Sequence, residues 1–174
     1  MTEETVLPPR KTSRFRTLAT FIASDALGTG GKASLRRGVP ATVVGQPAFH
    51  QAIHTAGIAV HELDAEVWGA IVQAIALTAG NAFTTPAGKA MAAAGLSEAR
   101  FSKLMAARGD TLRDQLGLVA RYLAAKQAPI DWTELGNLLL ADCHGDDERV
   151  AKLRFRLAQG YYRELNSADQ REAG

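Results

Sequence analysis

Apolar side chains recur along most of the chain at intervals of three and four residues, which places them on one face of an α-helix. The segment 111–127 shows this pattern clearly, with an inward-facing stripe of Leu112, Leu116, Val119 and Leu123. Polar N-cap residues and glycines stand between such segments, where helices begin and end. The pattern predicts helices over 14–27, 33–37, 88–94, 97–107 and 111–127, and further helices that begin near Pro47, Asp64, Asp131 and Asp147.

The composition also favours an all-α fold. Alanine and leucine dominate, runs of β-branched residues are short, and 47% of the 174 residues are hydrophobic,. The most apolar predicted helix follows Asp64 and should form the core of the N-terminal part. Thr84, Thr85 and Pro86 then mark a break,. We therefore expect two small helical bundles packed together, an N-terminal helical lobe over 1–87 and a C-terminal helical bundle over 88–174.

The last predicted helix, from Asp147 onward, separates apolar from basic positions. At 3.6 residues per turn, Arg149, Lys152, Arg156 and Arg163 fall within an arc of about 60° and span about 20 Å along the helix,. Such a cationic ridge is the electrostatic pattern expected for a polyanionic partner. A helix face that is merely solvated shows the same pattern, so the ridge alone does not decide between the two.

Positive charge occurs in blocks, although the formal net charge is only +2. Seven Lys and Arg residues lie in 10–37, seven in 89–126 and six in 149–171, with none in 38–88 or 127–148. Blocks of this kind can form separate basic surfaces. Because aromatic residues are few, we expect phosphate contacts to dominate over base stacking, with weak sequence preference and steep salt dependence.

Two segments resemble ligand-binding motifs without meeting their requirements. The glycine-rich segment 28–32 is not a phosphate loop, because its glycine spacing is wrong and Ala33 follows the lysine,. We expect a flexible loop there. His50 and His54 have the spacing of zinc ligands on a helix, but Gln51 stands where a metalloprotease has glutamate, and no second ligand pair has a fixed spacing,.

Catalysis finds little support elsewhere. Cys143 and His144 are adjacent in a predicted turn, which does not make a nucleophile–base pair,. The acidic turn 142–148 lacks the ligand spacing of a calcium loop. We therefore predict no catalytic residue, no metal site and no cofactor. The single cysteine suits a reducing cytoplasm, and we find neither a secretory signal nor an apolar stretch long enough to cross a membrane,.

A series of motifs carries a family resemblance through its order and spacing. In the N-terminal half the motif is Leu35-Arg36-Arg37-Gly38. In the C-terminal half the motifs are Gly88-Lys89-Ala90-Met91-Ala92, Gly95-Leu96-Ser97-Glu98-Ala99-Arg100-Phe101, Leu123, Pro129-Ile130-Asp131-Trp132, Leu138-Leu139-Leu140 and Ala158-Gln159-Gly160-Tyr161-Tyr162. Over about 15–162 the chain resembles CasB, the small subunit of the type I-E CRISPR surveillance complex, Cascade.

The resemblance implies an all-helical, cytoplasmic protein of antiviral defence that has no catalytic activity of its own. It implies as partners the crRNA, the target DNA through its phosphates, other Cascade subunits and a second copy of the chain. Two copies would lie beside the subunits that hold the crRNA and help to hold the opened target DNA (the R-loop), including the displaced strand. A separate helicase-nuclease would cleave the DNA.

The resemblance assigns nucleic-acid contacts to Arg36, Arg37, Arg100 and Arg121, and also to Arg108, which lies at a turn of variable length. Charge blocks and helical spacing add further cations. The complete set of expected nucleic-acid-binding residues is Lys32, Arg36, Arg37, Arg100, Lys103, Arg108, Arg121, Lys152, Arg156 and Arg163. We expect these side chains to converge into one continuous basic track after folding.

Two other functions remain open on the sequence alone. A helical protein–protein adaptor would use an apolar surface and make no direct contact with nucleic acid. A small transcription regulator would prefer one duplex sequence, but no recognition-helix turn and no zinc finger is found. Binding of the isolated chain to single-stranded DNA over a series of salt concentrations separates the adaptor from the nucleic-acid-binding protein.

Overall fold

The computed structural model describes residues 13–173, and within this range the chain is helical, with no strand. It contains ten α-helices and two short 3-10 helices: α1 (Arg14–Ala23), η1 (Asp25–Leu27), α2 (Gly28–Arg36), α3 (Pro40–Val44), α4 (Pro47–Thr55), η2 (Glu62–Asp64), α5 (Ala65–Leu77), α6 (Ala87–Ala93), α7 (Glu98–Ala106), α8 (Gly109–Ala125), α9 (Thr133–Cys143) and α10 (Asp147–Glu172). The all-α prediction is confirmed.

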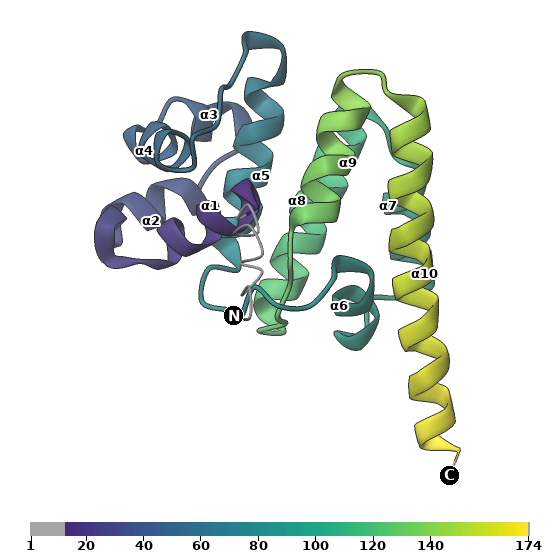
Figure 1. Ribbon diagram of the computed structural model, residues 1–174. Helices are drawn as coiled ribbons and strands as arrows, with labels where there is room; N and C mark the ends of the chain where they lie inside the picture. The colour runs from purple at the N-terminus through teal and green to yellow at the C-terminus, as the bar shows by residue number, and fades with distance from the viewer. Residues whose placement is uncertain (1–12, 174) are drawn as a thin grey trace, which may run out of the picture.

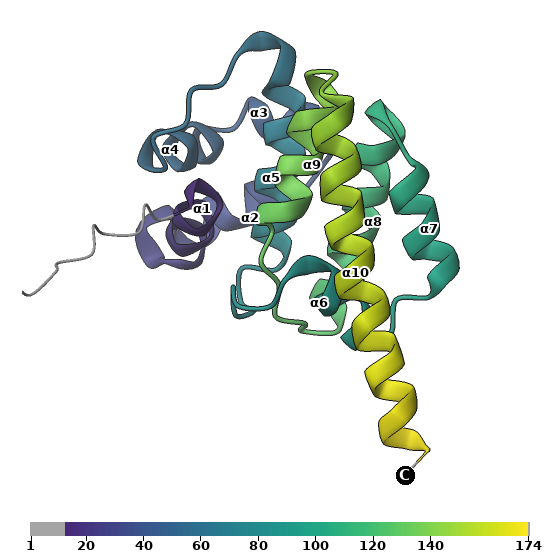
Figure 2. The same ribbon diagram turned by 45° about the vertical axis from the view of Figure 1, so that its right-hand side comes forward.

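Helix α5 lies between the N-terminal helices and the rest of the molecule (Figure 1). On one side it packs against α1, α2 and α3, and on the other against α8 and α9. Helix α10 packs along α9 and α6, and its last turns extend past the other helices (Figure 2). No helix in the described range is both long and apolar enough to span a membrane.

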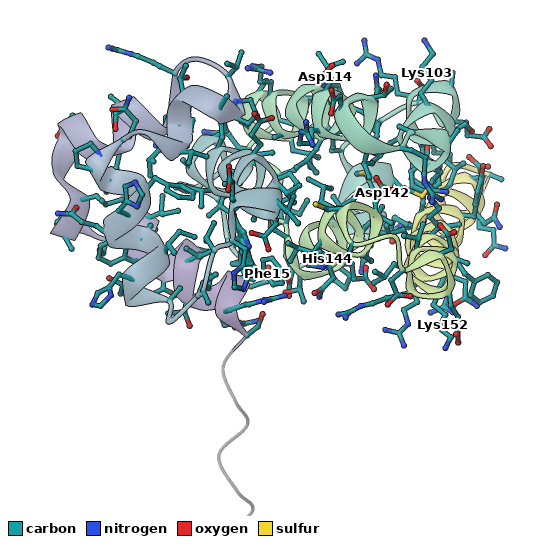
Figure 3. The ribbon with its side chains drawn as sticks, turned by 90° about the horizontal axis from the view of Figure 1, so that it is seen from above. Phe15, Lys103, Asp114, Asp142, His144 and Lys152 are labelled. Carbon is teal, nitrogen blue, oxygen red and sulfur yellow. The ribbon has the colours of Figure 1, made fainter. Side chains whose placement is uncertain are left out.

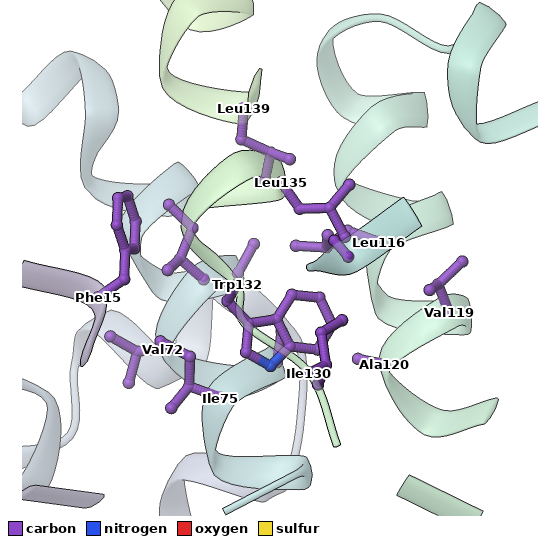
Figure 4. Close-up of a cluster of buried hydrophobic side chains, with 14 of the residues drawn as sticks. Phe15, Val72, Ile75, Leu116, Val119, Ala120, Ile130, Trp132, Leu135 and Leu139 are labelled. Atoms are coloured by element: carbon purple, nitrogen blue, oxygen red, sulfur yellow. The ribbon is translucent and has the colours of Figure 1, made fainter. Parts of the chain in front are cut away.

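The buried hydrophobic side chains form one cluster to which both halves of the chain contribute. Trp132, completely enclosed at the start of α9, lies near the middle of this cluster (Figure 4). Its indole Nε1 donates a hydrogen bond to Oγ1 of Thr78, 2.9 Å away, at the end of α5. The rings of Phe15 and Trp68 stack with their centres 5.9 Å apart. The two-bundle arrangement and its boundary at residue 87 stay predictions.

The predicted helices of the C-terminal half are confirmed to within two residues for α6, α7 and α8. Ser97 is the N-cap of α7, and its Oγ accepts a hydrogen bond from the Arg100 N–H at 3.4 Å,. Helix α8 begins two residues earlier than predicted, with Arg108 at the N-cap and Asp110 in the first turn.

The prediction of a flexible loop over 28–32 is wrong, because these residues form the first part of α2. Gly28, at φ +63°, turns the chain from η1 into α2, a conformation that suits glycine,. Gly31 then packs against Leu27 and Ala48: a Cβ there would lie 3.4 Å from Leu27 and 3.5 Å from Ala48, which are ordinary van der Waals distances. Tertiary packing against α4 therefore outweighs the low helix propensity of glycine. The short helix α3 has no counterpart among the predicted helices.

Candidate nucleic-acid interface

Helices α7 and α8 present a group of exposed cations around one half-buried tyrosine. The Arg100 guanidinium lies 5.6 Å from the centre of the Tyr122 ring, and Nζ of Lys126 lies 5.8 Å from the same centre. Lys103 follows Arg100 by one turn of α7 and is also exposed,. None of these three cations forms an ion pair with any described residue, so their charges are available to an external anion.

A hollow of about 240 Å³ opens between Arg100 and Lys103 of α7 and the facing side of α8. We call it the α7–α8 pocket. A second hollow of about 280 Å³, the α5–α8 hollow, lies on the neighbouring side of α8 and includes Arg113 and Arg121. Leu118, which is 59% exposed, lines both hollows. The two hollows are therefore neighbours on α8, with Leu118 between them.

The α5–α8 hollow contains one neutralised and one available cation. Arg113 forms ion pairs with Glu66 at 3.3 Å and with Asp110 at 2.5 Å. Arg121 is exposed and forms no ion pair within residues 13–173. We define the α8 surface as the two hollows together with the exposed cations Arg100, Lys103, Arg121 and Lys126. The first three of these line the hollows, and Lys126 lies beside the Tyr122 ring.

Arg37 lies next in sequence to the α5–α8 hollow, because the following residue, Gly38, lines that hollow. Its side chain is exposed and makes no hydrogen bond or ion pair to the rest of the described chain. The preceding residue is engaged differently: Nε of Arg36 donates a hydrogen bond to the Ala76 carbonyl at 2.9 Å, near the end of α5. Of the predicted pair Arg36 and Arg37, Arg37 is the one whose guanidinium N–H groups have no partner among the described residues.

Two further predicted cations are held by the protein itself. Nζ of Lys32 donates to the Ala23 carbonyl at 2.9 Å and lies 3.9 Å from the Asp25 carboxylate. Nε of Arg108 lies 2.6 Å from Oδ1 of Asp142, and a second ion pair joins Arg108 to Asp147. These contacts fasten α2 to the end of α1, and the start of α8 to the end of α9. Part of each charge is thus already compensated.

The predicted cations of α10 lie on a different surface. Lys152 and Lys103 project from opposite sides of the molecule (Figure 3). Lys152 forms an ion pair with Glu148 one turn earlier at 2.6 Å. Arg156 and Arg163 are exposed and form no ion pair among the described residues. The structure therefore does not bring all ten predicted side chains into one track. It distributes them between the α8 surface, the α10 ridge and the N-terminal helices.

Sequence reasoning missed one basic side chain, Lys126, and one spatial relationship, the proximity of Arg14 to Arg149. Lys126 joins the α8 surface, and its spacing of four residues from Tyr122 on one helix was an available signal,. Arg14 lies over Trp68, 5.0 Å from the ring centre, in a hollow that it shares with Arg149. Burial lowers the pKa of Arg14, and the nearby positive charge of Arg149 lowers it further,. Because this neighbourhood joins residues far apart in sequence, local spacing carried no signal for it.

The residues considered for metal binding or catalysis are dispersed. The described part of the chain contains no group of three or more His, Cys, Asp or Glu side chains with metal-binding geometry. His144 faces the buried Asp64, with Nε2 3.6 Å from a carboxylate oxygen, whereas Sγ of Cys143 donates to the Leu63 carbonyl at 3.4 Å. Burial and the negative charge of Asp64 raise the pKa of the Cys143 thiol, which disfavours a thiolate nucleophile,.

Comparison with protein families finds a match to the model described as CRISPR-associated protein Cse2, over residues 31–162. This range includes the entire α8 surface and nine of the ten predicted cations, and it ends one residue before Arg163. Comparison with curated proteins and with solved structures finds no match.

Proposed function

The chain belongs to the CRISPR-associated Cse2 (CasB) family, the non-catalytic small subunit of type I-E Cascade, and from this premise we propose that it holds the opened target DNA. In this proposal the α8 surface contacts the phosphates of the separated strands, including the displaced strand. Exchanging a DNA duplex for an RNA–DNA heteroduplex is nearly balanced in free energy, so modest backbone contacts to the opened strands shift the equilibrium. The guide supplies the sequence recognition, and a non-specific cationic surface is sufficient for the subunit.

The observation that supports the proposal most directly is the contrast between paired and available cations. Arg108 and Arg113 are neutralised by carboxylates, whereas Arg100, Lys103 and Arg121 point their charges outward with no carboxylate at ion-pair distance among the described residues. Cations around two neighbouring hollows suit a chain of phosphates, because each contact releases condensed counterions from the nucleic acid.

Family membership implies that the partners are nucleic acids and other Cascade subunits. We further propose a second copy of the chain within the complex. Phe155 on α10 is 63% exposed, although it is large and apolar. An exposed side chain of this kind suits a contact with a neighbouring subunit and is also the observation that favours the alternative function, a helical adaptor without direct nucleic-acid contact.

The test uses Cascade assembled with crRNA and a matching duplex target. Permanganate reactivity of thymines in the displaced strand reports how much of the target is open. We expect reactivity to fall when the chain is replaced by its Arg100→Glu, Arg121→Glu variant, while the amount of variant in the complex stays the same. Unchanged reactivity with the variant fully incorporated would contradict the proposal and favour the adaptor.

A salt series on the isolated chain separates the two functions independently. A phosphate-binding surface gives measurable affinity for single-stranded DNA at low salt, and the logarithm of that affinity falls linearly with the logarithm of salt concentration. An adaptor shows no binding even at the lowest salt concentration.

A further inference from the structure

The α7–α8 pocket combines an apolar floor with a cationic rim. Leu96 and Val119 are buried at its base, whereas Arg100 and Lys103 are exposed at its edge. Between floor and rim lies the half-buried Gln115, whose amide makes no hydrogen bond to any residue in the described range. The occupant that such a hollow fits is flat and apolar on its faces, polar at its edge, and joined to negative charge.

Tyr122 gives the pocket a fixed aromatic wall. Its hydroxyl donates a hydrogen bond to the Ala94 carbonyl at 2.8 Å, which holds the ring in place. The Arg100 guanidinium lies 5.6 Å from the ring centre, so a planar cation and an aromatic ring are already associated at the mouth of the pocket,. Bases of single strands stack on aromatic rings and on guanidinium planes of this kind.

We propose that the α7–α8 pocket seats one unstacked nucleobase of a single strand whose phosphates contact Arg100 and Lys103. The inference rests on the proposed function and adds to it a base-binding site. A volume of about 240 Å³ is below the range of about 300–1,000 Å³ typical of pockets for larger ligands, so the pocket takes a single base and leaves the sugar outside,.

The identity of the base is left open by the chemistry of the lining. Leu118 and Tyr122 belong to the lining and offer hydrophobic and aromatic surface against which any base can pack. The Gln115 amide offers both a donor and an acceptor, which pair with the edge of every base in one orientation or another. The pocket therefore recognises the presence of a base without reading its sequence, as a guide-directed complex requires.

The test compares two oligonucleotides of equal length on the full chain by fluorescence anisotropy: one of thymidines, and one of abasic sites with the same number of phosphates. We expect the thymidine oligonucleotide to bind about tenfold more tightly, the effect of one stacked base. Equal affinities would overturn the base site while leaving the phosphate contacts of the proposed function intact. Failure of both oligonucleotides to bind at low salt would instead overturn the proposed function itself.

Filling the pocket gives a second comparison. Gln115→Trp should bring the ratio of the thymidine affinity to the abasic affinity close to one, because the indole occupies the pocket. Ala151→Trp adds the same side chain at an exposed position on α10 outside the pocket, and should leave this ratio unchanged. If Gln115→Trp retains the full preference for thymidine while its circular dichroism spectrum is unchanged, the base lies elsewhere and the proposal is wrong.

Photocrosslinking tests the site on the unaltered chain, and does not depend on whether a variant folds. An oligonucleotide that contains 5-iodouracil, irradiated in the complex, should form its principal crosslink with Tyr122. Mass spectrometry identifies the crosslinked residue. A principal crosslink to Tyr162 on α10 would overturn the assignment.

Discussion

Nε of Arg108 lies 2.6 Å from Oδ1 of Asp142, and the other carboxylate oxygen of Asp142 accepts the Gly109 N–H at 2.7 Å. One carboxylate at the end of α9 thus binds both the side chain and the backbone at the start of α8. The Asp142 side chain is only 6% exposed. Arg108 therefore stabilises the contact between α8 and α9, whereas the family resemblance led us to expect it to contact nucleic acid.

We expect Asp142→Ala to lower the free energy of unfolding by about 1–3 kcal/mol, because it leaves the Gly109 N–H without its acceptor and removes the less exposed of the two ion-pair partners of Arg108,. Urea denaturation measures the loss. Asp147→Ala is the matched control, since Asp147 also pairs with Arg108 but its side chain is 76% exposed. Exposed ion pairs contribute about 0–1 kcal/mol, so the control should lose less. An equal loss of stability in the two variants would show that the burial of Asp142 does not strengthen its contribution to the free energy of unfolding.

The contact between α6 and α10 depends on a glycine. A Cβ at Gly88 would overlap the Leu157 carbonyl and lie 2.9 Å from the Tyr161 nitrogen, both of them backbone atoms that cannot turn away. We expect Gly88→Ala to destabilise the fold by about 1–3 kcal/mol, the usual range for overpacking. Thermal and urea unfolding measure this.

Gly30→Ala provides the opposite control for Gly88→Ala. Gly30 lies inside α2, no atom would lie within 4 Å of its added Cβ, and its φ is not positive. The same substitution there should stabilise the protein by about 0.4–1 kcal/mol, because it restricts the unfolded chain. If both substitutions destabilise the protein, the close approach of α6 to α10 is not what makes Gly88→Ala destabilising.

Tyr161 makes the free energy of unfolding depend on pH in the alkaline range. Its ring is fully buried, and its hydroxyl donates to the Leu96 carbonyl at 2.5 Å. Burial is the main cause that raises the pKa of Tyr161, with further contributions from Glu98 and Tyr122,. The unfolded chain therefore loses this proton first, and the stabilising contribution of Tyr161, complete below pH 10, falls as pH rises from about 10 through the folded-state pKa,.

The corresponding measurement is the free energy of unfolding between pH 8 and pH 11 for the wild type and for Tyr161→Phe. The variant should be less stable at pH 8 by about 1 kcal/mol, because the Leu96 carbonyl loses its donor. Its stability should then decline less steeply with pH, so that the two curves converge. Parallel curves would mean that Tyr161 does not contribute to the alkaline loss.

The sequence predicted the elements with strong local signals and failed where packing overrides them. Helices α7 and α8 have periodic apolar stripes and recognisable ends, and both are confirmed. The glycine-rich residues 28–32 were expected to form a flexible loop, yet they form the first part of α2, where Gly31 lies against Leu27 and Ala48. The contact with Ala48 involves a neighbour distant in sequence, and therefore does not show in local propensity.

The same distinction applies to the candidate interface. Arg100 and Lys103 share one face of α7, and helical spacing is sufficient to group them. Neither the pairing of Arg108 with Asp142, 34 positions later, nor the separation of Lys152 from Lys103 follows from spacing. Charge blocks show where cations are concentrated along the sequence. The fold determines which of these cations are paired with carboxylates and on which side of the molecule each one lies.

Charge reversal on the two basic surfaces tests the proposal that the α8 surface holds the opened DNA. Arg100→Glu, Arg121→Glu and Arg156→Glu, Arg163→Glu change the formal charge equally, so their long-range effects on an anionic ligand are matched. We expect the α8 pair of substitutions to weaken target binding by Cascade more strongly than the α10 pair. The loss should be the same for several protospacers, since phosphates carry no sequence information.

For the isolated chain on single-stranded DNA, each lost contact should reduce the slope of log affinity against log salt by about 0.7. An equal loss from the α10 pair would extend the interface around both sides of the molecule. A loss confined to some protospacers would mean that these arginines contact bases, which a surface that only grips the sugar-phosphate backbone does not do.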